Sequence, residues 1–433
     1  MRRLITRGRT LVLSSTARSA YILFAGNLTD SVFAFLFTII TFRLLTTADF
    51  GIFSALNNFV FTAVLILDLG LGSALLHFLP YWNSRRQPSR SEAYLSAAFL
   101  MRVGIASAVG LMLGFFSFVI APGFFKTDQN WAIILAGASL VTISGLDILN
   151  FALQAYRKFL PSAITANTFS LLRFIFVCAF ALLGLPFSVT TAAAITLISP
   201  VLGIILPVRW LPLPRLYLPA KPLISSLLGF SGWLGVAKIT STVATRLDIQ
   251  IVLLFLGTAA AGIYSVAARL ANFYPVIIAS FTAVLATRLS SMTTPGQLLR
   301  FSPKVVLFQL ILASGMLLAI GLARPFVTLL FGLSAAPSVP LFRGLTLAYL
   351  PYLLASFPNA VIIYYFKRPN VAGFMGLIQL ATAFFSNLVA TPIFQSFGPI
   401  ISLGLANTLL LLINLFMVAK LWTSASSAPA LPD

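Results

Sequence analysis

Long apolar stretches alternate with short polar breaks along all 433 residues of the chain. Most stretches hold roughly 20 residues or more, which is the length that an α-helix needs to cross the hydrocarbon core of a membrane. No polar break is long enough to fold as a domain of its own. We therefore predict an all-α integral membrane protein with about twelve spans, near residues 19–45, 50–79, 92–121, 131–155, 161–185, 189–209, 229–256, 259–286, 303–325, 340–366, 369–392 and 398–422.

The positive residues test this count, because cytoplasmic loops are enriched in Lys and Arg. With twelve helices and both termini on one side, nineteen cations fall on that side, and the opposite side holds only Arg43, Lys126, Arg324 and Arg343. One helix more or fewer would exchange the sides of every later loop and destroy this asymmetry. We therefore expect a multi-pass protein with both termini in the cytoplasm. The basic N-terminus is predicted to be a leader on a retained first helix, because its apolar patch is interrupted before the first long span.

Composition excludes several other classes of protein. Hydrophobic residues make up 59% of the chain and charged residues 8%, against about 25% charged in a soluble domain. The net charge of +20 lies mostly in short loops beside the membrane, so it predicts anionic lipid rather than nucleic acid as its neighbour. Cys178 is the only cysteine, which excludes an internal disulfide, and no Cys/His cluster exists to hold a metal. We expect no metal and no cofactor.

A proline-rich polar segment at 211–222 divides the spans six and six. It is predicted to link an N-terminal lobe, residues 1–210, to a C-terminal lobe, residues 223–433. A weak repeat supports this division: LLTTADFGIFSAL at 44–56 aligns with FLGTAAAGIYSVA at 255–267, a constant offset of 211. Both segments form the turn from the first helix of a half to the second. Two matching bundles around a central cavity are a transporter layout.

Ionisable residues inside the spans are the candidates for function, because a charge at bilayer depth is costly unless it is paired or hydrated. The candidates for substrate binding are the cations Arg102, Arg173, Lys238, Arg246 and Arg269. The candidates for coupling or gating are the acids Asp248, Asp68, Asp147 and Asp30. In one interpretation the cations line a hydrated cavity that attracts a phosphate or another anionic headgroup. In the other, the charges pair off, for instance Asp147 with Arg173, and hold neighbouring helices together.

The seventh span holds the densest cluster of charges. Arg246 and Asp248 are two residues apart, so they cannot face one partner helix unless the helix is broken between them. We interpret Asp248 as a coupling carboxylate that exchanges a proton or Na⁺, with a fixed salt bridge to Arg269 or Lys238 as the equal alternative. Six amides also fall in or near the spans and either meet sugar hydroxyls or join helices: Asn27, Asn57, Asn58, Asn150, Gln154 and Asn272.

The sequence carries no sign of an enzyme. No Walker A motif, GxSxG elbow, HExxH motif or loop large enough for a catalytic domain occurs. Without an ATPase module, energy for transport would come from an ion gradient or from the membrane potential.

Two motifs carry a family resemblance. The first half holds RLLTTADFGIFSALNNFVFTAVLILDLGLGSALLHF, with Asp49, Phe50 and Gly51 followed by Asp68, Leu69, Gly70 and Leu71. The second half holds RLDIQIVLLFLGTAAAGIYSVAARLANF, with Asp248, Gly257, Gly262, Tyr264, Ala267 and Leu270. Both resemble signatures of the polysaccharide flippases, the Wzx-type branch of the multidrug/oligosaccharidyl-lipid/polysaccharide exporter superfamily. The twelve predicted spans argue against the lipid II flippase branch of the superfamily, for which the resemblance implies fourteen spans.

The resemblance implies a V-shaped, two-lobed protein of the bacterial cytoplasmic membrane that flips polyprenyl-diphosphate-linked oligosaccharide to the outer leaflet by alternating access. The partners it implies are this substrate, membrane lipids, a coupling proton or sodium ion, and glycan polymerase or assembly proteins. Two alternatives remain open. A multidrug antiporter of the same superfamily should have a net acidic cavity for cationic drugs. A membrane-embedded glycan polymerase or ligase usually has a long outer loop with clustered Arg or His, and the loop around 326–340 is short and lacks both.

Overall fold

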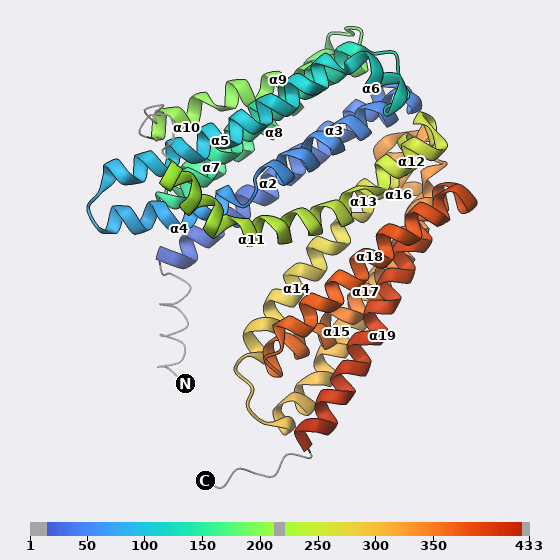
Figure 1. Ribbon diagram of the computed structural model, residues 1–433. Helices are drawn as coiled ribbons and strands as arrows, with labels where there is room; N and C mark the ends of the chain where they lie inside the picture. Colours follow the sequence, from blue (N-terminus) through green and yellow to red (C-terminus); the bar gives the residue numbers. More distant parts are fainter. Residues whose placement is uncertain (1–14, 212–220, 427–433) are drawn as a thin grey trace. The chain divides into compact units, whose positions relative to one another are not determined.

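A computed structural model describes residues 15–211 and 221–426, and in these ranges all regular structure is helical (Figure 1). The chain packs as two compact units, Met1–Val243 and Ala244–Asp433. Unit 1 contains, in chain order, α2 (Ser15–Leu44), α3 (Thr47–Leu67), α4 (Leu71–Ser84), α5 (Pro88–Phe115), α6 (Ser117–Gly123), α7 (Asn130–Ala155), α8 (Phe159–Leu182), α9 (Val189–Gly203), α10 (Ile205–Trp210) and most of α11 (Lys221–Arg246).

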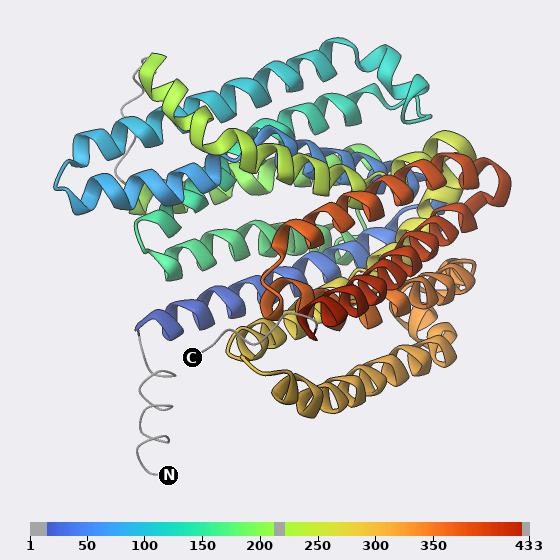
Figure 2. The same ribbon diagram turned by 60° about the horizontal axis from the view of Figure 1, so that its bottom comes forward.

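Unit 2 begins near the end of α11. It contains α12 (Asp248–Leu256), α13 (Thr258–Ala271), α14 (Phe273–Leu289), α15 (Pro295–Gly321), α16 (Ala323–Phe331), the short turn η1 (Leu333–Ala335), α17 (Ser338–Ala360), η2 (Val361–Tyr365), α18 (Pro369–Phe394), the turn η3 (Gln395–Phe397) and α19 (Gly398–Ser426). In both views α18 and α19 run side by side as an antiparallel pair (Figures 1 and 2).

The helices confirm the predicted span count. Ten segments of the described chain are long and apolar enough to cross a membrane. One of them, Pro369–Thr423, holds the two helices α18 and α19. The predicted span at 229–256 corresponds to α11 with α12, where several side chains lie outside the described part. The protein is therefore an all-α, multi-pass membrane protein with about twelve transmembrane helices.

Several spans are broken, and three of the breaks come three residues before a proline. A proline lacks the N–H that would bond the carbonyl four residues earlier, and its ring crowds that carbonyl. The breaks and their prolines are Ile204 with Pro207, Asn272 with Pro275, and Leu322 with Pro325. A further proline, Pro358, lies near the end of α17, just before η2, where the helix widens into a π-helical turn.

The break between α3 and α4 has a different cause. Leu69 and Gly70 take left-handed conformations, with φ of 47° and 78°. A side chain on Gly70 would also collide with α11, because a Cβ there would lie 2.7 Å from the carbonyl oxygen of Ser231. Across the same contact, a Cβ on Gly235 would lie 2.7 Å from the oxygen of Leu69. The break is thus a docking point for α11 within unit 1.

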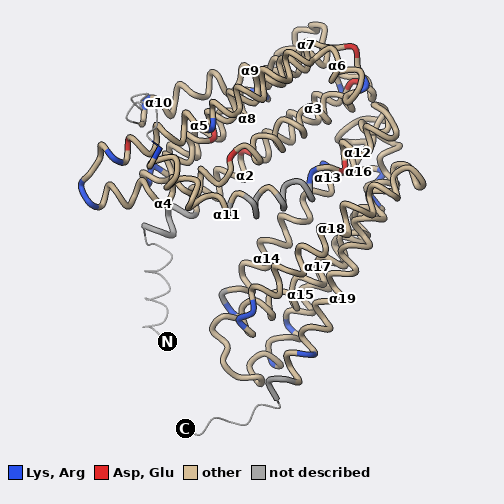
Figure 3. The backbone as a smooth tube through the Cα atoms, viewed as in Figure 1, with Lys and Arg blue, Asp and Glu red and all other residues tan. Residues whose placement is uncertain are grey.

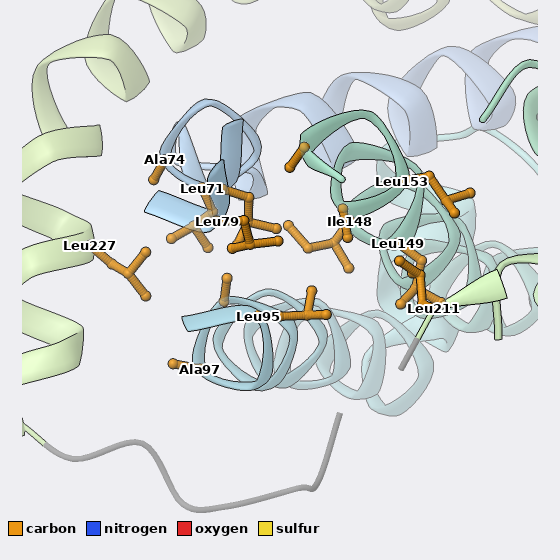
Figure 4. Packing of buried hydrophobic residues seen from close by; sticks show 14 residues of the cluster. Leu71, Ala74, Leu79, Leu95, Ala97, Ile148, Leu149, Leu153, Leu211 and Leu227 are labelled. Atoms are coloured by element: carbon orange, nitrogen blue, oxygen red, sulfur yellow. The ribbon is translucent and has the colours of Figure 1, made fainter. Parts of the chain in front are cut away.

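The core of unit 1 also includes α11. Leu227 of α11 is fully buried and joins the apolar cluster that α4, α5 and α7 form, with Leu71, Leu95 and Leu149 among its members (Figure 4). The predicted linker, 211–222, falls for the most part outside the described residues, as does the start of the basic leader. Residues 221–243 pack with unit 1. The lobe boundaries at 210 and 223 stay a prediction.

Candidate functional site

Most Lys and Arg residues lie near the ends of helices, as expected for residues at the edges of a membrane (Figure 3). The candidate site residues are exceptions, because they lie within the predicted membrane spans, either inside a helix or at a break between two helices. The structure distributes them between two regions of unit 1 and one region of unit 2. Lys238 belongs to α11, but its side chain lies outside the described part of the chain.

The first region of unit 1 is a buried ion-pair network centred on Arg102 of α5. Arg102 is fully buried, and its Nη1 donates to Oδ1 of Asp68 at 2.6 Å. Its Nη2 donates to the carboxylate of Asp147 on α7. Oδ1 of Asp68 also accepts the backbone N–H of Gly72 at 3.1 Å, which ties the network to the start of α4. Asp147 thus pairs with Arg102 rather than with Arg173, and one guanidinium joins three parts of unit 1.

The second region surrounds Arg173 of α8. Only 4% of Arg173 is exposed. Its guanidinium carbon lies 4.1 Å from the ring centre of Phe37 and 5.2 Å from that of Phe169, within the range of cation–π attraction. Its Nη2 donates to Oδ1 of Asn57 at 3.2 Å. Aromatic faces and an amide, rather than bulk water, therefore surround this positive charge.

Asp30 of α2 belongs to the same region. It accepts a hydrogen bond of 2.5 Å from Oγ of Ser170 and interacts electrostatically with Arg173. Two of the predicted site residues, one acid and one base, are thus brought together between α2 and α8, which pack closely along their length.

Several of the amides join helices. Asn57 of α3 accepts the hydrogen bond from Arg173 of α8 described above. Asn150 of α7 accepts from Oγ of Ser162 on α8 at 2.6 Å, and Gln154 donates to the same hydroxyl at 3.2 Å. For these three residues the structure supports the helix-joining alternative.

Unit 2 holds the third region, at the break between α11 and α12. Leu247 interrupts the helix, so that α11 ends at Arg246 and α12 begins at Asp248. In an unbroken helix Arg246 and Asp248 would point in nearly opposite directions, and the break removes this constraint. Asp248 accepts the backbone N–H of Ile249 at its Oδ1 and the hydroxyl of Tyr264 at its Oδ2, both at 2.9 Å.

A second arginine joins this region from α13. Arg269 is half-buried and interacts electrostatically with Arg246, which in turn interacts with Asp248. In the described part of the chain no ion pair joins Asp248 to Arg269. Asp248 is the only acidic residue between residues 148 and 432 of the sequence. Two guanidinium groups and one carboxylate therefore give this region a net positive charge, which suits an anionic group.

Two tyrosines of this region had no role assigned from the sequence. Tyr264 is part of the second motif, but only the structure reveals its bond to Asp248. Tyr349 of α17 interacts electrostatically with Asp248, and its ring centre lies 6.5 Å from that of Tyr352. The one sequence signal for this pair is its spacing of three residues, which places both rings on one face of a helix. We call Arg246, Asp248, Tyr264, Arg269 and Tyr349 the unit 2 charge cluster.

The cluster combines fixed positive charge with a hydrogen-bonded carboxylate. Such a set of groups can bind an anion through its guanidiniums and can bind a proton or a cation at its carboxylate. The described residues contain no group of three or more His, Cys, Asp or Glu side chains suited to a metal ion.

Known structures share this fold. An inward closed conformation of the lipid II flippase MurJ has a TM-score of 0.75 and 14% identity, with 92% of this chain and 87% of that chain covered. An inward-facing multidrug resistance MATE transporter of the MOP superfamily has a TM-score of 0.65 and 15% identity, covering 92% and 96%. A MOP superfamily transporter from Pyrococcus furiosus, described as having a binding pocket of reverse polarity, has a TM-score of 0.56 and 14% identity, covering 95% and 96%.

The fold is therefore that of the MOP superfamily transporters. The chain belongs to the polysaccharide biosynthesis protein family, whose model matches residues 16–292. This match confirms the resemblance seen in the two motifs. No curated protein sequence gives a significant match.

Proposed function

We propose that the protein flips a polyprenyl-diphosphate-linked oligosaccharide from the cytoplasmic to the outer leaflet of a bacterial cytoplasmic membrane by alternating access, with both termini in the cytoplasm. The observation that carries this proposal is the unit 2 charge cluster, in which the guanidinium groups of Arg246 and Arg269 outnumber the single carboxylate of Asp248. Membership of the polysaccharide biosynthesis family supports the choice of substrate.

The physical reason is the headgroup. A diphosphate carries negative charge that cannot enter hydrocarbon unaided, and guanidinium groups bind phosphate oxygens in pairs and keep their charge at any working pH. In unit 1, by contrast, two carboxylates meet the charge of Arg102, so we assign that network to holding helices together. Arg173 and Lys238 remain proposed contributors to headgroup binding.

Coupling is assigned to Asp248. A carboxylate beside fixed cations can change its proton or Na⁺ occupancy as access alternates. Protonation would remove the one negative charge of the cluster and strengthen its hold on an anion. The driving force would be an ion gradient or the membrane potential, which supplies about 2.3 kcal/mol per charge per 100 mV. Asp30, Asp68 and Asp147 remain secondary candidates. Membrane lipids and, downstream, glycan polymerase or assembly proteins are the proposed partners.

The test is flipping in proteoliposomes that contain the full chain and undecaprenyl diphosphate linked to a fluorescent-labelled hexose, with a membrane-impermeant quencher that reports the outer leaflet. We expect Arg269→Gln to lower the initial rate about tenfold or more, a loss of about 1.4 kcal/mol of stabilisation. The matched control is Arg324→Gln, because Arg324 is exposed at the start of α16. It should change the rate less than about twofold.

Unchanged flipping by Arg269→Gln at equal amounts of folded protein would contradict the proposal. The multidrug alternative is tested in the same vesicles with ethidium. A cationic dye should be repelled by a net positive cluster, so ethidium transport that needs Asp248 would favour the antiporter instead.

A further inference from the structure

The turn between α4 and α5 carries a concentration of positive charge (Figure 3). Arg85, Arg86 and Arg90 lie on this turn and the start of α5, and all three are exposed. None of them pairs with an acid in the described part of the chain. The nearest acid in the sequence is Glu92, which interacts electrostatically with Tyr156 instead. The three arginines therefore form a surface of unneutralised positive charge, which we call the α4–α5 arginine patch.

Two of the guanidinium groups are held in place by aromatic rings. The guanidinium carbon of Arg85 lies 4.2 Å from the ring centre of Tyr81, and that of Arg90 lies 4.6 Å from the ring centre of Trp82. Stacking of this kind uses the face of a guanidinium group and leaves the N–H groups along its edge available. Those N–H groups are the donors that bind phosphate oxygens in pairs. The patch is therefore prearranged to bind a phosphate.

The supporting rings are fixed to the core of unit 1. Trp82 stacks on Tyr94 of α5 with ring centres 6.2 Å apart, and the hydroxyl of Tyr94 shares a hydrogen bond of 3.0 Å with Oγ of Ser226 on α11. His77 of α4 stacks on Phe230 of α11, with ring centres 4.5 Å apart. Because these contacts join α4, α5 and α11, the arginines lie on a rigid support, which a specific binding site requires.

Arg86 adopts a backbone conformation that favours glycine. Its φ is 57°, and the N–H of Gln87 closes the turn by donating to the carbonyl oxygen of Trp82 at 3.0 Å. Glycine is the usual residue at this position after a helix, since a side chain makes the left-handed conformation costly. An arginine here lowers stability, so we expect its positive charge to serve a purpose other than folding.

The start of α5 adds to the positive charge of the patch. Gln87 makes no side-chain hydrogen bond to the first turn of α5, and no described group accepts the N–H of Ser89 or of Arg90. Unsatisfied N–H groups and the helix dipole attract anions at the start of a long helix. Guanidinium groups and backbone N–H groups therefore act together at the end of the α4–α5 hairpin.

The surface beside the patch is apolar and aromatic. Leu76 and Tyr81 of α4 and Phe230 of α11 are large exposed side chains in the turns of helix that precede or adjoin the arginines. A phospholipid presents a matching order of groups, from an anionic phosphate through the interfacial region to acyl chains. With both termini in the cytoplasm, as proposed above, this turn faces the leaflet in which anionic lipids give a negative surface potential.

We propose that the α4–α5 arginine patch is a specific site for the phosphate group of one anionic phospholipid of the cytoplasmic leaflet. This lipid is a bound partner of unit 1, distinct from the transported substrate. Since the supporting rings also contact α11, the bound lipid stabilises the packing of α11 against α4 and α5. The site does not depend on which molecule the protein transports.

The test measures the binding of single lipids to the delipidated full chain in detergent by native mass spectrometry. The probe is dioleoyl phosphatidylglycerol, and the neutral reference is dioleoyl phosphatidylcholine. We expect the first phosphatidylglycerol to bind wild-type protein about tenfold more tightly than phosphatidylcholine. Arg86→Gly and Arg90→Gln should each reduce this preference to less than about threefold. Arg300→Gln is the charge-matched control, because Arg300 is exposed near the start of α15 and stacks on no described ring.

Arg86→Gly also separates lipid binding from folding. Without lipid, the variant should melt at the wild-type temperature or up to about 2 °C above it, because glycine accepts a φ of 57° without strain. Phosphatidylglycerol should then raise the melting temperature of the wild-type protein more than that of the variant. Lys126→Gly is the matched backbone control, because Lys126 has a φ of 53° and lies outside the patch. It should relieve the same strain and keep the lipid preference.

Four results would overturn the site. The first is an unchanged preference in both Arg86→Gly and Arg90→Gln. The second is an equal loss of preference in Arg300→Gln, which would show diffuse attraction of lipid to any surface cation. The third is a lower melting temperature of lipid-free Arg86→Gly, which would assign this arginine to the end of α4. The fourth is displacement of phosphatidylglycerol by an equal concentration of inorganic phosphate, which would show an anion site that needs no lipid.

Discussion

The hydroxyl of Tyr264 donates a hydrogen bond of 2.9 Å to the carboxylate of Asp248. Under the repeat offset of 211 residues, the equivalent positions of the first half are Phe53 and Phe37. Their rings are also in contact, with centres 6.0 Å apart. The two halves thus keep the same pair of positions together but fill it with different chemistry. The ionisable pair belongs to the second half alone, which supports assigning the coupling role there.

The first prediction concerns this carboxylate. Asp248→Asn keeps an acceptor for Tyr264 but removes the negative charge and the ability to exchange a proton. We expect the variant to bind bare undecaprenyl diphosphate at least as tightly as wild-type protein, because the cluster becomes more positive. Flipping should lose its dependence on an imposed pH or Na⁺ gradient, measured in the proteoliposome assay. Retention of the full gradient dependence would remove Asp248 from the coupling role.

The second prediction concerns the ion-pair network of unit 1. Arg102→Leu leaves Asp68 buried beside Asp147 without the guanidinium that neutralises both. Breaking a buried pair from one side costs about 3–5 kcal/mol, so we expect a large fall in thermal stability and in membrane protein level. Asp147→Asn should cost less, because 34% of that side chain is exposed. A stable Arg102→Leu protein with impaired headgroup binding would instead assign Arg102 to the substrate.

The third prediction separates the charge of Arg173 from its shape. Arg173→Lys keeps a positive charge but loses the planar guanidinium that lies over Phe37 and reaches Asn57. We expect a stability loss of about 1–2 kcal/mol with little change in headgroup affinity. Thermal unfolding and lipid binding of the same preparation measure both. A selective loss of affinity at unchanged stability would show that the planar guanidinium, and not its charge alone, binds the headgroup.

The fourth prediction concerns the break between α3 and α4. Gly70→Ala places a Cβ 2.7 Å from the carbonyl oxygen of Ser231 at a residue with φ of 78°. We expect a stability loss of more than about 1 kcal/mol, from backbone strain and displacement of α11. Gly104→Ala is the control, because its Cβ would meet nothing within 4 Å in the middle of α5. That substitution should be neutral or stabilising.

The span count was predictable because membrane helices leave their pattern in nearly every residue. The length of each apolar stretch predicts a span, and the distribution of Lys and Arg among the loops predicts whether the number of spans is even or odd. Of the interruptions, Pro275 and Pro358 were also predictable, since a proline acts on its own helix. The break at Leu247 could be raised from the sequence only as one option, because no proline or glycine marks it and its geometry depends on the surrounding helices.

The charged residues of the site were predictable individually, but their partners were not. Asp68 and Asp147 reach Arg102 from separate helices, and sequence spacing says nothing about which helices lie side by side. Tyr349 was missed for the same reason: an aromatic residue in an apolar helix looks like core until the carboxylate beside it is located.

Leu227 of α11 is part of the core of unit 1. The boundary between the two compact units, after Val243, therefore does not coincide with the predicted linker between the two sequence halves at 211–222. A gene split within 212–220 would therefore yield two polypeptides of which the second contributes a helix to the interior of the first. Co-expressed fragments should copurify without any tether. Each fragment made alone should be degraded. The first would lack α11 and leave its apolar core uncovered, and the second would expose the apolar face of α11.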